Sequence, residues 1–159
     1  MGFFTADLCD NFSEKTDVLG PDFKSYGGKR KFKGQIVTVK LDKNNKDLAQ
    51  LLKNQEGIGK VVVVDVDMKY FAVVGDNLMK FATDNKYEGI VVNGYVRDTV
   101  TTKDFDTGLV AKGTCPRKYI PVQDGLFGVP LVIDGVDINP GDYIYVDQDG
   151  IVVSKEKLV

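Results

Sequence analysis

Four consecutive valines, Val61 to Val64, lie between Lys60 and Asp65. Successive side chains of a β-strand point to opposite faces of the sheet, so a strand without polar alternation has to be covered on both faces. Strands of this kind are typical of parallel sheets whose connections are helices. The valine run therefore predicts a buried strand over residues 60–65 with a layer of structure on each side.

Helical and extended patterns alternate around the valine run. β-Branched residues predict a strand over 34–41 before it, and an apolar segment predicts a strand over 90–92 after it. An amphipathic helix is expected in each interval, the first with an apolar stripe at Leu48, Leu51 and Leu52 and the second over 76–86. These two strand–helix–strand passages indicate a parallel or mixed sheet with crossover helices.

Local signals predict the boundaries of these and of shorter elements. Ser, Thr, Asn and Asp side chains accept hydrogen bonds from free N–H groups at helix starts, and glycine interrupts strands. The expected boundaries are a cap at Thr5 for a helix over 6–12, a loop over 18–21, a cap at Asn44 or Asn45 for the helix that carries Leu48, a break at Gly94, a cap at Thr101 or Thr102 for a short helix over 103–106, and a short strand over 108–111.

The last third of the chain changes in character. Short apolar segments are separated there by the turn dipeptides Asp134-Gly135, Pro140-Gly141 and Asp149-Gly150. The expected strands cover residues 129–133, 136–138, 142–146 and 150–153. Because no Gly/Ser-rich or Pro-rich linker separates this part from the first, we expect residues 1–159 to form a single α/β domain. Its mixed β core would carry crossover helices and a β-rich C-terminal third.

Composition excludes several kinds of chemistry. The 159 residues include no histidine, which rules out Ser-His and Cys-His catalysis and imidazole metal ligands. A metal ion would have to be held by oxygen ligands, which favours Mg²⁺ or Mn²⁺. The formal net charge of −2 predicts no nucleic-acid binding, and the basic residues Lys29, Arg30, Lys31 and Lys33 fit a solvated loop.

The sequence shows no signal for a membrane or for export. No stretch reaches the roughly 18–20 apolar residues that cross a bilayer, and the first residues lack a basic and apolar signal segment. We therefore expect a cytoplasmic protein without membrane association, in which Cys9 and Cys115 remain free thiols.

The expected start of the helix over 76–86 is suited to bind an anion. Gly75, Asp76 and Asn77 occupy this start, where the first N–H groups, including that of Leu78, have no helical partner. These N–H groups and the helix dipole together favour a negative charge. From the residues alone, an ordinary helix cap remains an alternative.

Charged pairs follow two of the expected strands. Arg97 suits a carboxylate and Asp98 suits a hard metal ion, although a structural ion pair between them remains an alternative. Asp65 and Asp67 form an Asp-x-Asp pattern that could hold a metal. We favour the interpretation that Asp65 ends the buried strand and that Asp67 begins a turn.

Several segments of the sequence match a known family. Asp76 is followed by twenty residues and then by Arg97-Asp98. The other matching segments are Gly75-Asp76-Asn77-Leu78, Gly89-Ile90-Val91-Val92-Asn93-Gly94, Gly113-Thr114-Cys115-Pro116-Arg117-Lys118, and the ending Pro140-Gly141-Asp142 with Asp149-Gly150-Ile151. On these segments the chain resembles the RraA-like family, which includes regulators of ribonuclease E activity and class II 4-hydroxy-4-methyl-2-oxoglutarate aldolases. The resemblance implies a swivelling β/β/α-type fold.

The resemblance also implies roles for the residues of this signature. The pyruvyl part of a small 2-oxo acid would lie against the backbone of residues 75–78, with Arg97 binding its carboxylate. Asp98 would hold a divalent cation, Mg²⁺ or Mn²⁺, and Asp76 would orient a water bound to it. The implied activity is retro-aldol cleavage of 4-hydroxy-4-methyl-2-oxoglutarate to give pyruvate, with decarboxylation of oxaloacetate, because both reactions pass through an enolate of pyruvate.

The same resemblance leaves a second function open, that of a non-catalytic protein that binds and inhibits ribonuclease E. Family members of that kind often lack the aspartate after the arginine, so Asp98 favours the enzyme. A methyltransferase is not expected, because the sequence lacks the glycine-rich strand–turn–helix that a methyl-donor cofactor would need.

The resemblance also bears on assembly and on the acid–base groups. It implies a homotrimer or a dimer of trimers with the site near a subunit boundary. Longer aldolases of the family carry a C-terminal extension that reaches a neighbouring subunit. With Val159 as the last residue, we expect no acid from such an extension, which leaves the general acid and base unassigned. For Arg117 and Lys118 we favour solvation at the surface, and a position at the site remains an alternative.

Overall fold

The computed structural model describes residues 2–41, 46–118 and 125–159, which form four helices and twelve strands. The helices are α1 (Thr5–Asn11), α2 (Lys46–Asn54), α3 (Asp76–Asp84) and α4 (Thr99–Thr102). The strands are β1 (Asp17–Val18), β2 (Lys24–Ser25), β3 (Phe32–Lys40), β4 (Lys60–Asp65), β5 (Ala72–Val74), β6 (Gly89–Val96), β7 (Gly108–Thr114), β8 (Leu126–Phe127), β9 (Leu131–Ile133), β10 (Val136–Ile138), β11 (Tyr143–Asp147) and β12 (Gly150–Ser154). None of these helices is long and apolar enough to cross a membrane.

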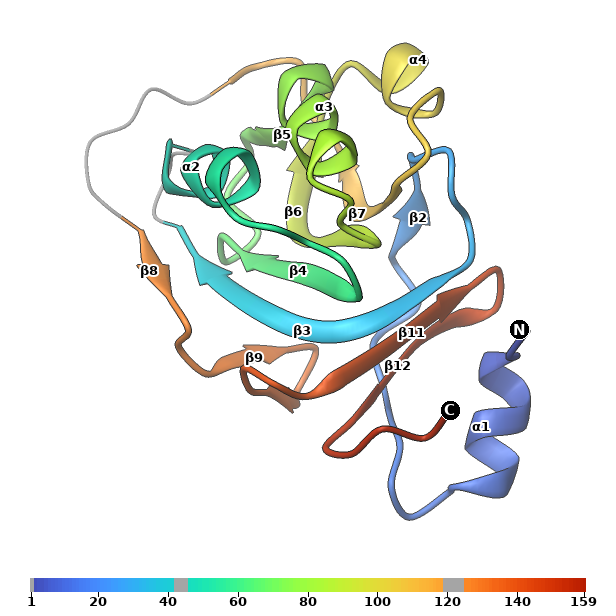
Figure 1. The fold of residues 1–159 in the computed structure, drawn as a ribbon. Helices are drawn as coiled ribbons and strands as arrows, with labels where there is room; N and C mark the ends of the chain where they lie inside the picture. Colours follow the sequence, from blue (N-terminus) through green and yellow to red (C-terminus); the bar gives the residue numbers. More distant parts are fainter. Residues whose placement is uncertain (1, 42–45, 119–124) are drawn as a thin grey trace.

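Ten of the described strands form one curled mixed sheet (Figure 1). Its order is β1-β12-β11-β3-β4-β6-β7-β2, with β5 added beside β6 and β8 beside β3. The neighbours β3, β4, β6 and β7 run parallel, as the two strand–helix–strand passages predicted. The remaining neighbours in the order pair antiparallel, and β9 and β10 form a separate hairpin.

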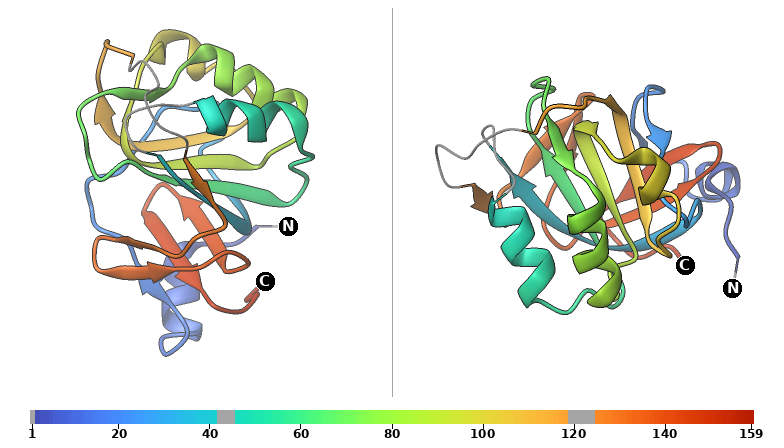
Figure 2. Two further views of the ribbon diagram at one scale, coloured as in Figure 1. Left: turned by 90° about the vertical axis from the view of Figure 1, so that its left-hand side faces the viewer. Right: turned by 90° about the horizontal axis from the view of Figure 1, so that it is seen from above.

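The valine run is covered on both faces, as expected from its lack of polar alternation. All four valines are 0% exposed. Val62 and Val64 belong to a core that includes the inward side chains of α2 and α3, among them Leu52. Val61 and Val63 face a second core, which strands β9 to β12 complete. Figure 2 shows α2, α3 and α4 on one side of the parallel strands and the C-terminal strands, with α1, on the other.

The cap predicted at Thr5 is wrong, and its partner lies far away in the sequence. Thr5 is the first residue of α1, and its side chain makes no capping hydrogen bond within the helix. Its N–H and its hydroxyl donate instead to the two carboxylate oxygens of Asp147, at 2.8 and 2.7 Å. Asp147 ends β11, so this pair ties the N-terminal helix to the C-terminal hairpin. The cap predicted at Asn44 or Asn45 lies outside the described residues.

Two other boundary predictions are corrected by tertiary contacts. Strand β6 continues through Gly94 to Val96, with a register shift against β7 between Val92 and Tyr95. A side chain at Gly94 would collide with Val66, so glycine here permits close packing and does not end the strand. The short helix is Thr99–Thr102 and not 103–106, because the Asp98 carbonyl accepts the first helical hydrogen bonds.

The β-rich C-terminal third is confirmed, with shifted ends. The two turns at Asp134-Gly135 and Asp149-Gly150 close the hairpins β9–β10 and β11–β12. Val129 and Pro130 lie outside β9. The loop predicted over 18–21 is wrong at its first residue, since Val18 pairs with Val152 as part of β1.

Candidate active site

The candidate site lies where the carboxyl ends of β5 and β6 meet. The two strands run parallel, with Val74 opposite Val96, and the Arg97 N–H donates to the Val74 carbonyl at 2.9 Å. The chain turns into α3 immediately after β5 and into α4 shortly after β6. Parallel pairing therefore brings the first residues of α3 beside Arg97 and Asp98, which are separated from them by about twenty positions in the sequence.

A small pocket of about 40 Å³ marks this junction. Each of the predicted site residues contributes to its wall, and these are Gly75, Asp76, Asn77, Leu78, Arg97 and Asp98. Lys118 lines the same pocket. The structure thus gathers the whole predicted set in one place.

Asp98 has the most constrained position in the pocket. Its backbone is left-handed, with φ 59° and ψ 35°, which is uncommon for a residue other than glycine. Its Oδ2 atom accepts a hydrogen bond from the Asp76 N–H at 3.1 Å and lies 4.0 Å from Nε of Arg97. The carboxylate thereby bridges the start of α3 and the guanidinium.

Gly75 makes this approach possible. A Cβ atom at this position would overlap Oδ2 of Asp98 and would lie 3.4 Å from Cγ of Arg97. The Gly75 backbone is extended, with φ −134°, so any residue could adopt its conformation. The requirement for glycine is therefore spatial, because the Asp98 carboxylate occupies the place of a side chain.

The pocket offers unused hydrogen-bond donors. The first helical hydrogen bond of α3 runs from the Met79 N–H to the Gly75 carbonyl, and the Asp76 N–H is taken by Asp98. No acceptor within the described parts of the chain serves the N–H groups of Asn77 and Leu78. The side chain of Arg97 is 36% exposed, and toward the described residues it donates a single long hydrogen bond of 3.5 Å, to the Pro116 carbonyl. Such donors suit a carboxylate or a developing oxyanion.

The donor set also fits a hard divalent cation. Asp76 and Asp98 are the carboxylates of the pocket, and Oδ1 of Asp98 accepts no hydrogen bond from the described residues. Within residues 2–41, 46–118 and 125–159, no group of three or more His, Cys, Asp or Glu side chains is arranged to hold a metal. Mg²⁺ commonly keeps several waters and takes one or two protein carboxylates together with substrate oxygens. The Asp98 carboxylate, whose side chain is 36% exposed, meets that requirement.

Lys118 lines the pocket, although it was not among the predicted site residues. We expected it to be solvated, and it is exposed, but its backbone forms a parallel bridge with Ala72, the first residue of β5. The Ala72 N–H donates to the Arg117 carbonyl at 2.8 Å. This pairing places a second cation at the pocket, and no local pattern in the sequence reveals it.

The Asp-x-Asp pair has a structural role, as we favoured. Asp65 is the last residue of β4 and is 1% exposed, and Asp67 follows in a turn with φ 52°. Asp65 accepts hydrogen bonds from the Asn93 amide at 3.0 Å and from Lys40 at 3.3 Å. Burial disfavours the charge of Lys40, but the carboxylates of Asp67 and Asp65 outweigh it and raise its pKa. Neither aspartate lines the candidate pocket.

The fold and the pocket together define an α/β protein with a curled mixed sheet, in which a helix start faces an Arg-Asp pair. Residues 5–153 match the model of the RraA-like family, described as aldolase/RraA. The chain therefore belongs to the RraA-like family, as its signature predicted, and the expected fold class is confirmed.

Relatives cover the chain almost completely. A Bacillus cereus protein, provisionally named 4-hydroxy-4-methyl-2-oxoglutarate aldolase, is 38% identical over 155 residues, 97% of each chain. A Laribacter hongkongensis protein with the same provisional name is 38% identical over 160 residues, the whole of both chains.

Solved structures of similar length share the fold. The RNA-processing inhibitor RraA from Thermus thermophilis has a TM-score of 0.94 and 33% identity, over 100% of this chain and 96% of that one. A protein of Geobacillus kaustophilus is described as S-adenosylmethionine:2-dimethylmenaquinone methyltransferase. It has a TM-score of 0.94 and 37% identity, over 98% of this chain and 97% of that one. These names belong to those proteins, and they differ in the activity they state.

Proposed function

We propose that this protein is a divalent-metal-dependent lyase that cleaves 4-hydroxy-4-methyl-2-oxoglutarate to two molecules of pyruvate, and that it also decarboxylates oxaloacetate. The observation that carries the proposal is the contact of the Asp98 carboxylate with the Asp76 N–H across the Gly75 gap. This contact keeps a carboxylate beside a helix start and a guanidinium. The aldolase names of relatives at 38% identity support the same class of reaction.

Arg97 and the start of α3 would bind the substrate. The guanidinium donors of Arg97 that face the pocket suit the carboxylate next to the 2-oxo group, in a charge-assisted and bidentate contact. Asn77 and Leu78 line the same pocket, and their N–H groups suit the 2-oxo oxygen. When the C–C bond breaks, negative charge grows on that oxygen, and preorganised N–H donors stabilise it.

Asp98 and Asp76 would serve the metal and the proton. Asp98 would hold a Mg²⁺ or Mn²⁺ ion, which supplies Lewis-acid polarisation of the substrate oxygens when bound. The carboxylate of Asp76 would accept a hydrogen bond from a water in the pocket and keep that water in place for proton transfer. The cation of Lys118, at the pocket edge, suits the second carboxylate of a dicarboxylic substrate.

The test is release of pyruvate from each substrate, followed through a coupled lactate dehydrogenase reaction. Mg²⁺ or Mn²⁺ should support turnover and a chelator should abolish it. Asp98→Ala should lower turnover by about 100-fold or more, because it removes the ligand of the metal. Asp104→Ala is a matched control, since Asp104 is an exposed aspartate shortly beyond α4 that lies outside the pocket. Activity that survives both the chelator and Asp98→Ala would refute the proposal.

A second candidate function is inhibition of an RNA-processing enzyme such as ribonuclease E. The similarity to the Thermus RNA-processing inhibitor, at a TM-score of 0.94, favours it. A Streptomyces coelicolor protein, RraAS2, described as an unusual member of the RNase ES inhibitor RraA protein family, shares the fold at 25% identity and a TM-score of 0.77. Purified chain added to a ribonuclease E cleavage assay at micromolar concentration should inhibit RNA cleavage if this function holds. Lack of inhibition by a chain that releases pyruvate would remove this candidate.

A further inference from the structure

The curled sheet is not closed, and its two ends lie on either side of a gap. Strands β1 and β2 follow each other in the sequence, yet β1 pairs with β12 at one end of the strand order and β2 pairs with β7 at the other. The segment over 19–23 connects them and therefore crosses from one end of the sheet to the other (Figure 1). Beneath this crossing lies a cavity of about 690 Å³, which we call the seam cavity.

The seam cavity has an apolar floor. Val110 comes from β7, and Val146 and Ile151 come from β11 and β12, so both ends of the sheet contribute. All three belong to the second hydrophobic core and are at most 4% exposed. The volume lies within the range of about 300–1,000 Å³ that is typical of small-molecule sites, which are mostly apolar with a few polar groups.

The crossing segment is held in place by the β9–β10 turn. Asp134, which begins that turn, accepts hydrogen bonds from the Gly20 N–H at 2.9 Å and from Nζ of Lys112 at 2.6 Å. The side chain of Lys112 is only 6% exposed, and its charge lies 4.6 Å from the ring centroid of Phe23. Since Gly20 and Phe23 both line the cavity, its upper wall is formed without a ligand.

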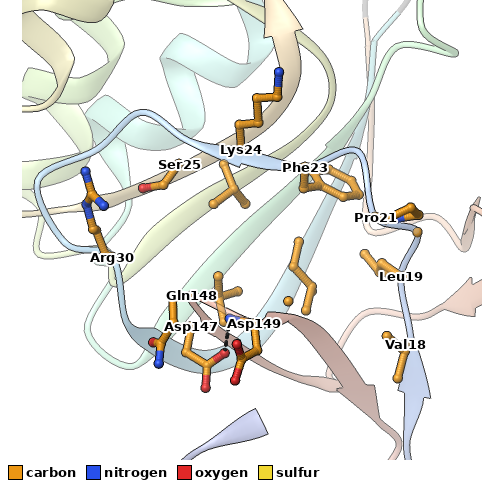
Figure 3. Close-up of a pocket in the computed structure, with 15 residues that line it drawn as sticks. Val18, Leu19, Pro21, Phe23, Lys24, Ser25, Arg30, Asp147, Gln148 and Asp149 are labelled. Atoms are coloured by element: carbon orange, nitrogen blue, oxygen red, sulfur yellow. Dashed lines mark hydrogen bonds between the residues drawn. The ribbon is translucent and has the colours of Figure 1, made fainter. Parts of the chain in front are cut away.

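The opposite lip of the cavity is acidic and equally fixed. Asp147 accepts hydrogen bonds from Thr5 and, at 2.9 Å, from the N–H of Asp149. Figure 3 shows both carboxylates and Gln148 at the end of β11 and in the turn that follows it, on the side of the cavity opposite Lys24. A negative group placed against this lip would be repelled by the carboxylates of Asp147 and Asp149. The donors that reach Asp147 are already used, so they would not bind such a group.

Positive charge is concentrated at one end of the cavity. Arg30 and Ser25 both line the cavity, and Figure 3 shows Arg30 at that end. Arg30 forms no ion pair with another described residue, so its donors are free for a ligand. Lys24 also lines the cavity, but its ammonium group points away from the floor and the acidic lip in Figure 3.

We propose that the seam cavity binds a small amphipathic monoanion, with an apolar tail on the valine and isoleucine floor and one carboxylate on Arg30. The apolar floor favours an apolar tail over a polar one, and the guanidinium of Arg30 favours one negatively charged head group. A second carboxylate would meet either the apolar floor or the acidic lip of Asp147 and Asp149. This site therefore discriminates against dicarboxylates, and it is separate from the pocket at the start of α3.

The experiment compares three eight-carbon probes by calorimetric titration and by amide chemical shifts of the ¹⁵N-labelled protein. Octanoate has the tail and one carboxylate, octanedioate has a second carboxylate, and 1-octanol has no charge. Octanoate should saturate a single site and shift the amides of Val110, Ile151 and Arg30. Octanedioate and 1-octanol should each bind at least about tenfold more weakly, because octanedioate places a second carboxylate against the apolar floor or the acidic lip and 1-octanol has no charge for Arg30.

Variants test the recognition of the head. Arg30→Ala should weaken octanoate binding about tenfold or more, because it removes a charge-assisted contact. Lys24→Ala is the matched control and should change binding by less than about threefold, since an exposed charge directed elsewhere contributes little. Both residues are exposed, so both variants should fold.

Three results would overturn the proposal. One is the absence of shifts at Val110 and Ile151 under a large excess of octanoate. Another is equal affinity for octanoate and 1-octanol, which would show that Arg30 does not recognise the head. The third is an Arg30→Ala variant that binds octanoate as tightly as the Lys24→Ala control does.

Discussion

Replacing Gly75 by alanine should disable the candidate active site with little damage to the fold. The new Cβ atom would overlap Oδ2 of Asp98, while Cγ of Arg97, at 3.4 Å, would be in ordinary contact. Backbone strain plays no part, because the residue has φ −134° and ψ −160°. The effect of the substitution therefore comes from displacement of the Asp98 carboxylate alone.

The size of the effect follows from this geometry. To reach van der Waals distance, the carboxylate would have to move by about 1 Å, and a misplacement of that size can lower turnover by about 100-fold. The hydrogen bond from the Asp76 N–H to Oδ2, now 3.1 Å long, would break. Because the Asp98 side chain is 36% exposed, this loss should cost only about 1 kcal/mol of unfolding free energy, or a decrease in Tm of about 2–4 °C.

Turnover of oxaloacetate and thermal unfolding of the same samples provide the test. Gly2→Ala is the control substitution, because its Cβ would meet only Nζ of Lys31, at 3.7 Å. A double-mutant cycle isolates the contact: in an Asp98→Ala background, Gly75→Ala should cost no further stability, since no carboxylate remains to be displaced. The reasoning fails if Gly75→Ala keeps turnover within about threefold of the wild type, or if it destabilises both backgrounds equally.

Three further predictions concern other parts of the molecule. Arg97→Ala should raise KM and lower kcat, with kcat/KM reduced about 10- to 100-fold and partly retained in Arg97→Lys, and steady-state kinetics with oxaloacetate will measure both constants. Burial of the Asp147 carboxyl acts to raise its pKa, but the N–H and hydroxyl donors of Thr5 outweigh burial and hold the pKa below the usual 3.8. The stability from this group is therefore present above pH 3.8 and lost as pH falls below it, and urea unfolding should show a smaller loss in Asp147→Asn than in the wild type. Asp65→Ala should destabilise the protein by about 2–3 kcal/mol, because it leaves buried donors such as the Asn93 amide unpaired, and a urea midpoint equal to that of the wild type would contradict this.

Elements that depend on burial pattern could be predicted from the sequence. The strand over 60–65 was predicted with the bounds that β4 has. Four consecutive valines are compatible only with a strand that is buried between two hydrophobic cores. The second crossover helix, α3, was also predicted at its observed start, Asp76. Both predictions rest on interactions between neighbours in the sequence and on the need to bury apolar surface.

Boundaries that depend on distant partners could not be predicted in this way. Thr5 has the residue type of a helix cap, but Asp147, 142 positions away, takes its N–H and hydroxyl. Gly94 resembles a strand break, but it lies under Val66 within a continuous strand. In each case the local preference is worth about 1 kcal/mol, which a single tertiary contact can override.

The candidate active site also combines features that the sequence indicated with features that only the tertiary structure decided. The sequence alone indicated the candidate residues, because the spacing of Asp76, Arg97 and Asp98 resembles that of the RraA-like family, to which the chain belongs. Only the tertiary structure decided that Gly75 admits the Asp98 carboxylate, that Lys118 joins the pocket through pairing with β5, and that the open ends of the sheet leave the seam cavity. The physical reason is that each of these depends on strands pairing across long sequence separations. Local patterns define which segments form strands, but they do not specify which strand edges become neighbours.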